Sequence, residues 1–511
     1  MRPPDPSAGD PTPWPRRDAK PEGTPWAALI ALMVLAAVLR TIGLDGGLWL
    51  DEIHTLLDSV RQPLLQIVTV FPGNNQHTFY SVLAHVSIRV LGEEAWSLRL
   101  PALLFGVATP PVLYLFAREF VGRSEALLAS LLLTVSYHHV WFSQNARGYT
   151  ALAFLALLSS WLLLRGLRRA STSDFVWYGV ASALGVYTHL TMVFMVIAHA
   201  IACAFLLGVP GRDKDALARW RRPVTGFALA AVFTLALYAP LLLDVQQFFL
   251  RRPNPNEIAT PAWAAKELLR GLQIGVGTAL GVPACGVLFV WGLRSFFRQS
   301  RFLLALFVLP GVITVAAAVA LARPIFPRFL FFLAGFGVLI LVRGALEIGA
   351  WLTLRLRPGE PAAPVTALGA ALVAALALLS AASLPFAYRY PKQDFDGAAR
   401  FLLAHRADRE PVVTAGGAMY AYRDYYRQPW VGVTSLEQLQ DIRSQGRRVW
   451  VIYTLPGYIE MRAPDLMKTL RDQCRVAGVF RGTVAEGDVT VCVVPPASDD
   501  PGSRAPGQPR Q

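Results

Sequence analysis

The sequence predicts a polytopic α-helical membrane protein with a small α/β domain at its C-terminal end. Hydrophobic residues make up 54% of the 511 residues and charged residues only 16%, whereas an average soluble domain has roughly 25% charged residues. The mean hydropathy is +0.42. Repeated apolar runs of about 15–22 residues are long enough to cross a hydrocarbon core about 30 Å thick. These observations exclude a soluble enzyme and a disordered scaffold.

Four regions follow from this pattern. Residues 1–25 and 497–511 are rich in Pro, Gly, Asp and Arg or Ser, and they are predicted to be disordered tails, the first of them cytoplasmic. Residues 26–384 form the predicted transmembrane domain. Residues 385–496 alternate short strands with amphipathic helices and form the predicted extracytoplasmic α/β domain.

About eleven transmembrane helices are expected from hydropathy and charge. The spans are placed near residues 26–44, 100–117, 125–142, 149–164, 175–190, 191–208, 224–243, 271–293, 302–321, 329–346 and 363–384. The weaker apolar stretch 79–91 is expected to lie in the membrane interface or to dip into the membrane. With this odd number of spans, Lys and Arg on the inner side outnumber those on the outer side by about two to one.

This charge bias predicts a multi-pass protein of the inner (plasma) membrane, with a cytoplasmic N-terminus and an extracytoplasmic C-terminal domain. If residues 79–91 crossed the membrane, the basic loops that follow would lie outside. The net charge of +14 is therefore assigned to membrane topology, and no nucleic-acid partner is expected.

Polar residues at or just above membrane depth cost free energy, so they usually have a function. We therefore look for the candidate site residues in the outer segments. The first, residues 43–58, interrupts the chain with glycines and then carries Asp51, Glu52, His54 and Asp58. On a helix, Asp51, Thr55 and Asp58 share one face, and His54 neighbours Asp58. The alternative is that the two adjacent carboxylates only stabilise the positive N-terminal end of an interfacial helix.

Two further outer segments carry arginines. Residues 137–149 place Arg147 beside hydrogen-bonding and aromatic side chains, and residues 322–329 place Arg323 and Arg328 on a proline-stiffened turn. The planar guanidinium suits bidentate binding of phosphate. The alternative is that each arginine only anchors the end of a span at the membrane surface.

The order and spacing of five motifs resemble a known family. The motifs are Leu48-Trp-Leu-Asp51-Glu52, Trp96-Ser-Leu-Arg99-Leu-Pro101, Ser143-Gln-Asn-Ala-Arg147-Gly-Tyr149, Tyr187-Thr-His189 and Pro327-Arg328-Phe329. They are similar to segments of the family-39-type membrane glycosyltransferases of the GT-C fold, which include protein O-mannosyltransferases and bacterial aminoarabinose transferases of lipid A. The resemblance covers residues 40–345.

The resemblance implies a glycosyltransferase that moves a monosaccharide from a polyprenyl-phosphate donor to a glycan, lipid or protein acceptor. It implies that Asp51 is the catalytic base and that arginines hold the donor phosphate. Our hypothesis is that Glu52 helps to orient Asp51 or the substrate. The implied substrate-binding residues are His54, His77, Tyr80, Gln144, Asn145, Arg147, Tyr149, His189, Arg323 and Arg328.

Two departures from the family pattern matter. Asn145 stands where many relatives have an acidic residue, and Gln76-His77-Thr78-Phe79-Tyr80 stands where many have H-P-P-L-Y. The first departure leaves Asp51 without a second carboxylate beside it, so we expect a metal-independent transfer without a cofactor. Attack opposite the leaving phosphate would invert the anomeric centre. No glycine-rich nucleotide motif is present in the sequence.

The alternative function is a transporter or flippase of lipid-linked or polar solutes, in which Arg147 and Arg328 would line a pathway. Transporters of this kind typically contain internal repeats and ionisable groups near the membrane midplane. The sequence shows no repeat, and its candidate residues gather at one face of the membrane. The enzyme is therefore favoured.

The predicted C-terminal domain contains strands at 411–415, 448–454, 475–480 and 489–494, and helices at 396–405 and 436–445. Cys474 and Cys492 flank the last strand pair, and an oxidising compartment would allow them to form a disulfide. The alternative is a pair of buried thiols. Cys203 and Cys285 lie in predicted spans and are expected to stay reduced.

Overall fold

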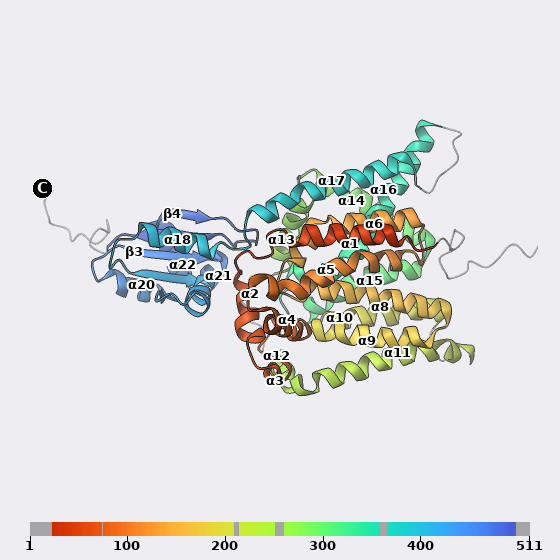
Figure 1. Cartoon of the computed structure of the whole chain (residues 1–511), viewed down its shortest axis with the longest axis horizontal. Coiled ribbons are helices and arrows are strands. Elements are labelled where there is room, and N and C mark those ends of the chain that lie inside the picture. The colour runs from red at the N-terminus through yellow and green to blue at the C-terminus, as the bar shows by residue number, and fades with distance from the viewer. Residues whose placement is uncertain (1–22, 74, 209–213, 251–259, 358–364, 497–511) are drawn as a thin grey trace, which may run out of the picture.

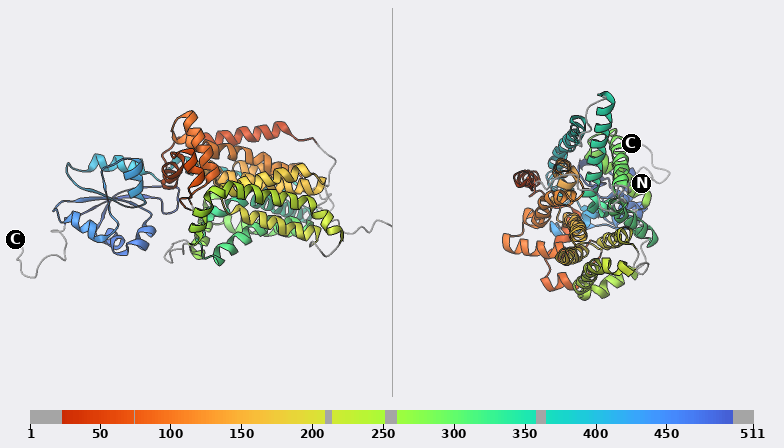
Figure 2. Two further views of the ribbon diagram at one scale, coloured as in Figure 1. Left: turned by 90° about the horizontal axis from the view of Figure 1, so that it is seen from below. Right: turned by 90° about the vertical axis from the view of Figure 1, so that its right-hand side faces the viewer.

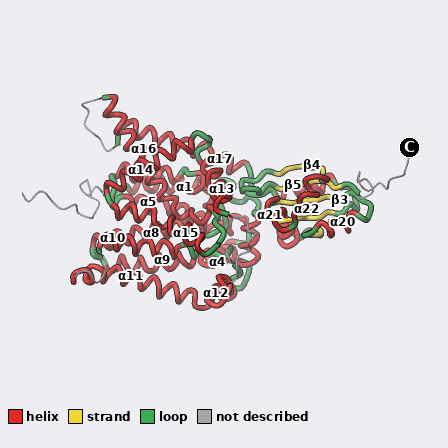
Figure 3. The backbone as a smooth tube through the Cα atoms, turned by 180° about the vertical axis from the view of Figure 1, so that it is seen from behind, coloured by secondary structure: helices red, strands yellow, loops and turns green. Residues whose placement is uncertain are grey.

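The computed structural model describes residues 23–496 apart from 74, 209–213, 251–259 and 358–364. The chain forms a bundle of helices and a smaller α/β domain beyond one end of that bundle (Figures 1 and 3). The predicted disordered tails, 1–25 and 497–511, lie outside the described residues except for 23–25. The α/β domain is shown in blue in Figure 2.

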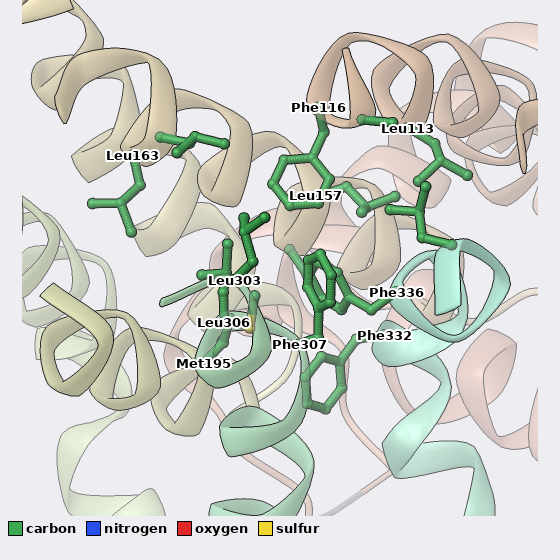
Figure 4. Close-up of a cluster of buried hydrophobic side chains, with 14 of the residues drawn as sticks. Leu113, Phe116, Leu157, Leu163, Met195, Leu303, Leu306, Phe307, Phe332 and Phe336 are labelled. Carbon is green, nitrogen blue, oxygen red and sulfur yellow. The ribbon is translucent and has the colours of Figure 1, made fainter. Parts of the chain in front are cut away.

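The bundle consists mainly of long helices that run between its two ends. They are α1 (Trp26–Thr41), α5 (Ala95–Ala117), α6 (Arg123–Thr134), α8 (Tyr149–Arg169), α9 (Thr172–Thr188), α10 (Met192–Leu207), α11 (Lys214–Tyr238), α14 (Gly281–Gln299), α15 (Arg301–Ala320), α16 (Ala334–Leu356) and α17 (Ala367–Arg389). They pack around a phenylalanine-rich core that includes Phe116, Phe307, Phe332 and Phe336 (Figure 4). The short helix α7 (Tyr137–Ser143) follows α6.

Several short elements gather at the end of the bundle that faces the α/β domain (Figure 1). They are α2 (Leu50–Thr55), η1 (Leu56–Val60), α3 (Leu64–Thr69), α4 (Thr78–Leu91), η2 (Ala239–Leu241), α12 (Leu242–Leu250), α13 (Pro261–Gly275) and η3 (Pro327–Leu333). The predicted helical stretch 79–91 corresponds to α4, and its location at the membrane interface stays a prediction.

Six helices of the described chain are long and apolar enough to cross a membrane, or seven if the bent pair α6–α7 counts as one span. Helices α1, α4 and α10 are apolar but shorter. The predicted membrane protein is therefore confirmed, whereas the count of eleven spans stays a prediction.

Two predicted spans are wrong in detail. The span at 125–142 is two helices that meet at a 57° bend, where Nη1 of buried Arg40 donates to the Thr134 carbonyl (3.2 Å). A side chain that takes a carbonyl out of the helical ladder is a usual cause of a sharp bend. The span at 271–293 is divided between α13 and α14, and Gly277, which lies between them, has a φ of +68°. A left-handed residue cannot continue a helix.

The α/β domain has one five-stranded mixed sheet in the order β2-β1-β3-β5-β4. Its strands are β1 (Val412–Gly416), β2 (Val431–Gly432), β3 (Val449–Thr454), β4 (Arg475–Phe480) and β5 (Val489–Val494). β1 pairs in parallel with β2 and β3, and β5 pairs antiparallel with β3 and β4. Helices cover the sheet: α18 (Phe395–His405), α19 (Gly417–Tyr420), η4 (Ala421–Tyr425), α20 (Leu436–Arg443), α21 (Pro456–Arg462) and α22 (Pro464–Gln473).

The alternating side chains of the central strand β3 explain this layered arrangement. Trp450 and Ile452 pack with α18 in one apolar cluster, while Val449 and Val451 pack with α20 and α22 in another. The four predicted strands and the two predicted helices are confirmed, although the second helix ends earlier, at Arg443. The sequence reading did not predict α19, η4, α21, α22 or β2.

The predicted disulfide is present between Cys474 and Cys492, whose Cα atoms lie 5.6 Å apart. It joins the end of α22 to β5. Cys203 and Cys285 are free thiols, as predicted.

Candidate active site

The candidate site forms where α2, the loop at 144–148 and η3 meet at the end of the bundle near the α/β domain. Helix α1 ends before Gly43, which has a φ of +71°, a conformation that glycine adopts without strain. Arg99 of α5 then fixes the chain that follows, because its guanidinium donates to the carbonyls of Leu44 (2.7 Å), Gly46 (2.7 Å) and Gly47 (3.0 Å). This anchor sets where α2 begins.

Asp51 lies at the centre of the site between two arginines. Its Oδ2 is 3.3 Å from Nη1 of Arg328 and 4.0 Å from Nη1 of Arg147. The Asp51 side chain keeps 17% of its surface exposed and that of Arg328 keeps 30%, whereas Arg147 is buried. Two cations therefore face one carboxylate that solvent or a ligand can still reach.

Several buried polar atoms of this site have no hydrogen-bond partner in the described structure. They are Oδ2 of Asp51, both ring nitrogens of His77, Nδ2 of Asn145, Nε of Arg147 and Nε of Arg328. Folded proteins leave few such atoms unsatisfied, because each costs roughly 1–3 kcal/mol. Their concentration around Asp51 is typical of a site whose polar ligand supplies the missing partners.

Histidine and aromatic rings form one wall of the site. The ring of His77 lies 4.8 Å from that of Tyr149 and 5.1 Å from that of His189, and His189 lies 5.0 Å from Phe329. Burial, followed by the positive charges of Arg147 and Arg328 with a contribution from His189, holds the pKa of His77 well below its usual range. His77 is therefore a neutral hydrogen-bonding group.

Gly148 is required beside this wall. A Cβ atom there would lie 2.7 Å from Cγ2 of Thr188 and 2.8 Å from Nδ1 of His77. The small residue lets the loop that carries Arg147 approach the wall closely.

Glu52 follows Asp51 in the sequence but points into the protein. It is fully buried and forms a two-pronged ion pair with Arg99, at 2.7 Å to Nε and 2.6 Å to Nη2. Its carboxylate also accepts the backbone N–H of Ala146 (2.7 Å). Both oxygens of Glu52 accept hydrogen bonds from within the protein. We therefore interpret Glu52 as a structural residue that holds α2, α5 and the Arg147 loop together.

Four other candidates have clear structural partners. The hydroxyl of buried Tyr80 donates to the Leu98 carbonyl (2.6 Å), and Nε2 of Gln144 donates to the carbonyls of Arg40 and Ile42. Oδ1 of Asn145 accepts from Nε1 of Trp49 (3.1 Å). Nη2 of Arg323 donates to the carbonyls of Phe248 and Phe249 at the end of α12.

His54 lies at the rim of the site, against the α/β domain. Its Nδ1 is 2.9 Å from Oδ2 of Asp58, and its ring stacks on Tyr420 at 4.0 Å. The Tyr420 hydroxyl donates to the other oxygen of Asp58 (2.6 Å). This cluster joins α2 and η1 to the C-terminal domain.

Sequence reading missed several residues that shape the site. Asn75 and Thr55 accept hydrogen bonds from Nη1 of Arg147. Lys392 and Gln393 reach the site segments from the start of the C-terminal domain. The spacing had placed Thr55 on one helical face with Asp51 and Asp58, although it was not predicted to be a site residue.

The described residues contain no group of three or more His, Cys, Asp or Glu side chains arranged to hold a metal ion.

Comparisons with known proteins support the resemblance seen in the motifs. Residues 78–243 match the family described as dolichyl-phosphate-mannose-protein mannosyltransferase. A Bacillus subtilis protein named "Putative mannosyltransferase YkcB" is 24% identical over 159 residues, which are 31% of this chain and 21% of that protein. The match therefore spans about a fifth of this relative's length.

Two of the solved structures that resemble this chain cover most of it. The apo structure of ArnT from Cupriavidus metallidurans aligns with a TM-score of 0.50 at 12% identity, covering 92% of this chain and 97% of that one. The apo oligosaccharyltransferase of Archaeoglobus fulgidus aligns with a TM-score of 0.51 at 12% identity, covering 88% and 73%. This chain is therefore a membrane protein with the GT-C glycosyltransferase fold, as its motifs predict.

Proposed function

We propose that this chain is a membrane glycosyltransferase that moves a monosaccharide from a polyprenyl-phosphate donor to an extracytoplasmic glycan, lipid or protein. One observation carries the proposal, namely the group of unsatisfied polar atoms around Asp51, Arg147 and Arg328. The family match at residues 78–243 supports a lipid-phosphate sugar as donor.

The two arginines are the proposed phosphate-binding groups. Each guanidinium can donate two parallel hydrogen bonds to phosphate oxygens, and each has an Nε–H without a partner. Negative charge develops on the phosphate as the glycosidic bond breaks, and fixed cations stabilise this charge without reorganising. The lipid tail of the donor would remain in the bilayer beside the bundle.

Asp51 is the proposed base. Its carboxylate lies 3.3 Å from Arg328. A bound phosphate competes for that guanidinium, which leaves Asp51 free to accept the proton of the acceptor hydroxyl or amine. The acceptor oxygen or nitrogen then forms the new bond to the anomeric carbon, and the bond to the phosphate oxygen breaks. Attack opposite the leaving phosphate inverts the anomeric centre, and no step calls for a metal ion.

Binding of undecaprenyl phosphate to the purified chain in nanodiscs tests the phosphate site. Arg147→Gln and Arg328→Gln should each weaken binding by about 10- to 100-fold, because a hydrogen bond to a charged group contributes roughly 1.5–3 kcal/mol. Arg323→Gln is the matched control, since that arginine binds the carbonyls of α12, and it should keep nearly full affinity. Unchanged affinity in both site variants would contradict the proposal.

The orientation is part of the proposal. Helix α8 runs from Tyr149 at the site to Arg168 and Arg169 at the far end, and basic residues favour the cytoplasmic side. We therefore place the site and the α/β domain outside the cytoplasm, in an inner (plasma) membrane. Topology reporters fused after residues 169 and 494 should give opposite signals, and equal signals would contradict this orientation.

The transporter alternative receives no specific support from the site, because the charged side chains of the described bundle that carry unsatisfied atoms, Asp51, Arg147 and Arg328, meet at one end of it rather than along a path through it.

A further inference from the structure

The segment between α17 and α18, residues 390–394, lies between the C-terminal domain and the candidate site. Its backbone pairs with the loop before β5, because Thr483 N donates to Pro391 O (2.9 Å) and Val484 N donates to Lys392 O (3.2 Å). Nε1 of Trp141 in α7 donates to the Thr483 hydroxyl (3.0 Å). The segment is thus fixed to the C-terminal domain on one side and to the bundle on the other.

The side chain of Lys392 holds the loop that carries Arg147. Its Nζ donates to the Gln144 carbonyl at 2.5 Å and lies 5.5 Å from the centre of the Trp141 ring. Gln144 stands three residues before Arg147, and the next residue, Asn145, has an unsatisfied Nδ2 in the site. The position of Lys392 is therefore coupled to the phosphate-binding loop by one charged hydrogen bond.

The neighbouring side chain of Gln393 holds the segment that carries Asp51. Its Oε1 accepts the backbone N–H of Leu50 (2.9 Å), and its Nε2 donates to the Thr454 hydroxyl at the end of β3 (3.2 Å). Leu50 is the first residue of α2, and N–H groups in the first turn of a helix have no partner within the helix. Gln393, which is buried, supplies that partner and ties α2 to the sheet.

We propose that residues 390–394 form a clasp through which the C-terminal domain positions the two halves of the active site, with Lys392 and Gln393 as its positioning residues. Lys392 fixes the position of the loop that carries Arg147, and Gln393 fixes the position of the helix that carries Asp51. This inference rests on the proposed transferase function, because the segments it positions are those that carry the proposed base and phosphate ligand.

The charge of Lys392 gives the clasp a measurable signature. Burial lowers the pKa of Lys392 from 10.5 to about 7; the negative charge of Glu52 opposes this shift and the positive charge of Arg99 adds to it. These two side chains, from α2 and α5, are the ionised groups that act on Lys392 within the described residues. The ammonium group therefore loses its proton as the pH rises through about 7.

The effect on stability has the opposite sign. Between about pH 7 and 10.5 the unfolded chain binds the proton of this lysine more tightly than the folded chain does. The contribution of Lys392 to stability therefore rises over that interval. A positioning role thus predicts that kcat falls above about pH 7 while this group does not destabilise the protein.

The test compares Lys392→Met, Lys392→Arg and the control Lys468→Met, whose lysine is exposed on α22, by measuring kcat and KM from pH 5.5 to 9. The donors in the assay are a panel of undecaprenyl-phosphate monosaccharides. The acceptor is supplied by membranes from a strain that lacks this protein. Lys392→Met should lower kcat by about tenfold at pH 6, and it should lose the decline above pH 7. Lys392→Arg stays charged, so it should keep kcat at pH 6 and remove the alkaline decline. Lys468→Met should match the wild type.

A wild-type kcat and alkaline decline in Lys392→Met would overturn the clasp. If that variant does not fold, Lys392→Arg and Gln393→Leu decide the matter, since a wild-type profile in both would equally overturn it. Failure of the proposed function gives a different result, which is no transfer by the wild-type protein from any donor of the panel. Thermal unfolding and undecaprenyl phosphate binding of each variant separate lost positioning from lost folding.

Discussion

The two ends of the helical bundle use the same charged residue types in different ways. At the end away from the α/β domain, the carboxylates are matched by arginines. Nε of Arg165 lies 3.0 Å from Asp174, and Nε of Arg343 lies 2.7 Å from Glu125. Arg168 pairs with Glu119 at 3.4 Å. These pairs tie neighbouring helices together, and each of these three carboxylates has an arginine partner within the protein.

At the end facing the α/β domain, Asp51 meets two arginines at 3.3 and 4.0 Å, and all three side chains retain an atom without a hydrogen-bond partner. Charged groups near a membrane are costly when unsatisfied. The difference between the two ends shows how a candidate active site differs from a structural ion pair. Both contain charged side chains, but only in the candidate site do those side chains keep atoms that lack a hydrogen-bond partner.

The same contrast separates two consecutive residues. Glu52 is buried with both oxygens hydrogen-bonded, while Asp51 is partly exposed with an unsatisfied oxygen. Substitutions at these two positions should therefore have separable effects on activity and stability.

The largest effect is expected for Asp51→Asn. The amide keeps the size of the side chain but cannot act as a base, so transfer should fall by roughly 10²- to 10⁴-fold. The variant should unfold at the wild-type temperature and bind undecaprenyl phosphate at least as tightly, because a carboxylate that competes for Arg328 has been removed. Asp45→Asn, on the exposed part of the same outer segment, is the control. Full transfer by Asp51→Asn would exclude Asp51 as the base.

The next effect is expected for Glu52→Gln, and it should act on stability. Removing one partner of a buried ion pair destabilises a protein by about 3–5 kcal/mol, and this change leaves Arg99 unpaired. The apparent melting temperature in detergent should fall clearly. Any transfer that remains at low temperature should approach the wild-type rate per folded molecule. A catalytic loss without a change in melting temperature would instead assign Glu52 to the chemistry.

The pH dependence of this pair gives a second check. Burial alone raises the pKa of Glu52. The charges of Arg99 and Lys392, together with hydrogen bonds from Arg99 and Ala146, more than reverse that effect and lower the pKa below 4.5 overall. A lowered pKa means that the stabilisation is present above about 4.5 and is lost as the pH falls below it. The melting temperature of the wild type should therefore decrease more steeply with acid than that of Glu52→Gln.

Sequence reasoning succeeded where local patterns decide the outcome. The strand at 448–454 alternates side chains between two apolar clusters, and the spacing of Cys474 and Cys492 around the last strand pair allowed the disulfide to be predicted. The segments that carry Asp51, Arg147 and Arg328 were also predicted, and the structure brings them together. Composition and periodicity are properties of short stretches, so one sequence suffices for them.

Sequence reasoning failed where a partner from a distant segment decides the outcome. Glu52 was grouped with Asp51, but its direction is set by Arg99, 47 positions away. Arg323 and Arg328 stand on one turn, yet only Arg328 meets Asp51, because Arg323 binds the end of α12. Lys392 was not considered at all, since its partner is a backbone carbonyl that no side-chain motif reveals.

The smallest effect is expected at the far end of the bundle, from Arg343→Gln. This change leaves buried Glu125 without its 2.7 Å partner, so stability should fall by about 1–3 kcal/mol. The double variant Glu125→Gln with Arg343→Gln removes both charges and should recover part of the loss, which a double-mutant cycle measures. Transfer per folded molecule and undecaprenyl phosphate affinity should stay at wild-type values, because neither residue contacts the site segments. If Arg343→Gln instead lowered transfer as strongly as Asp51→Asn at an unchanged melting temperature, charge at the far end would also belong to the function. The contrast between a satisfied structural end and an unsatisfied functional end would then be wrong.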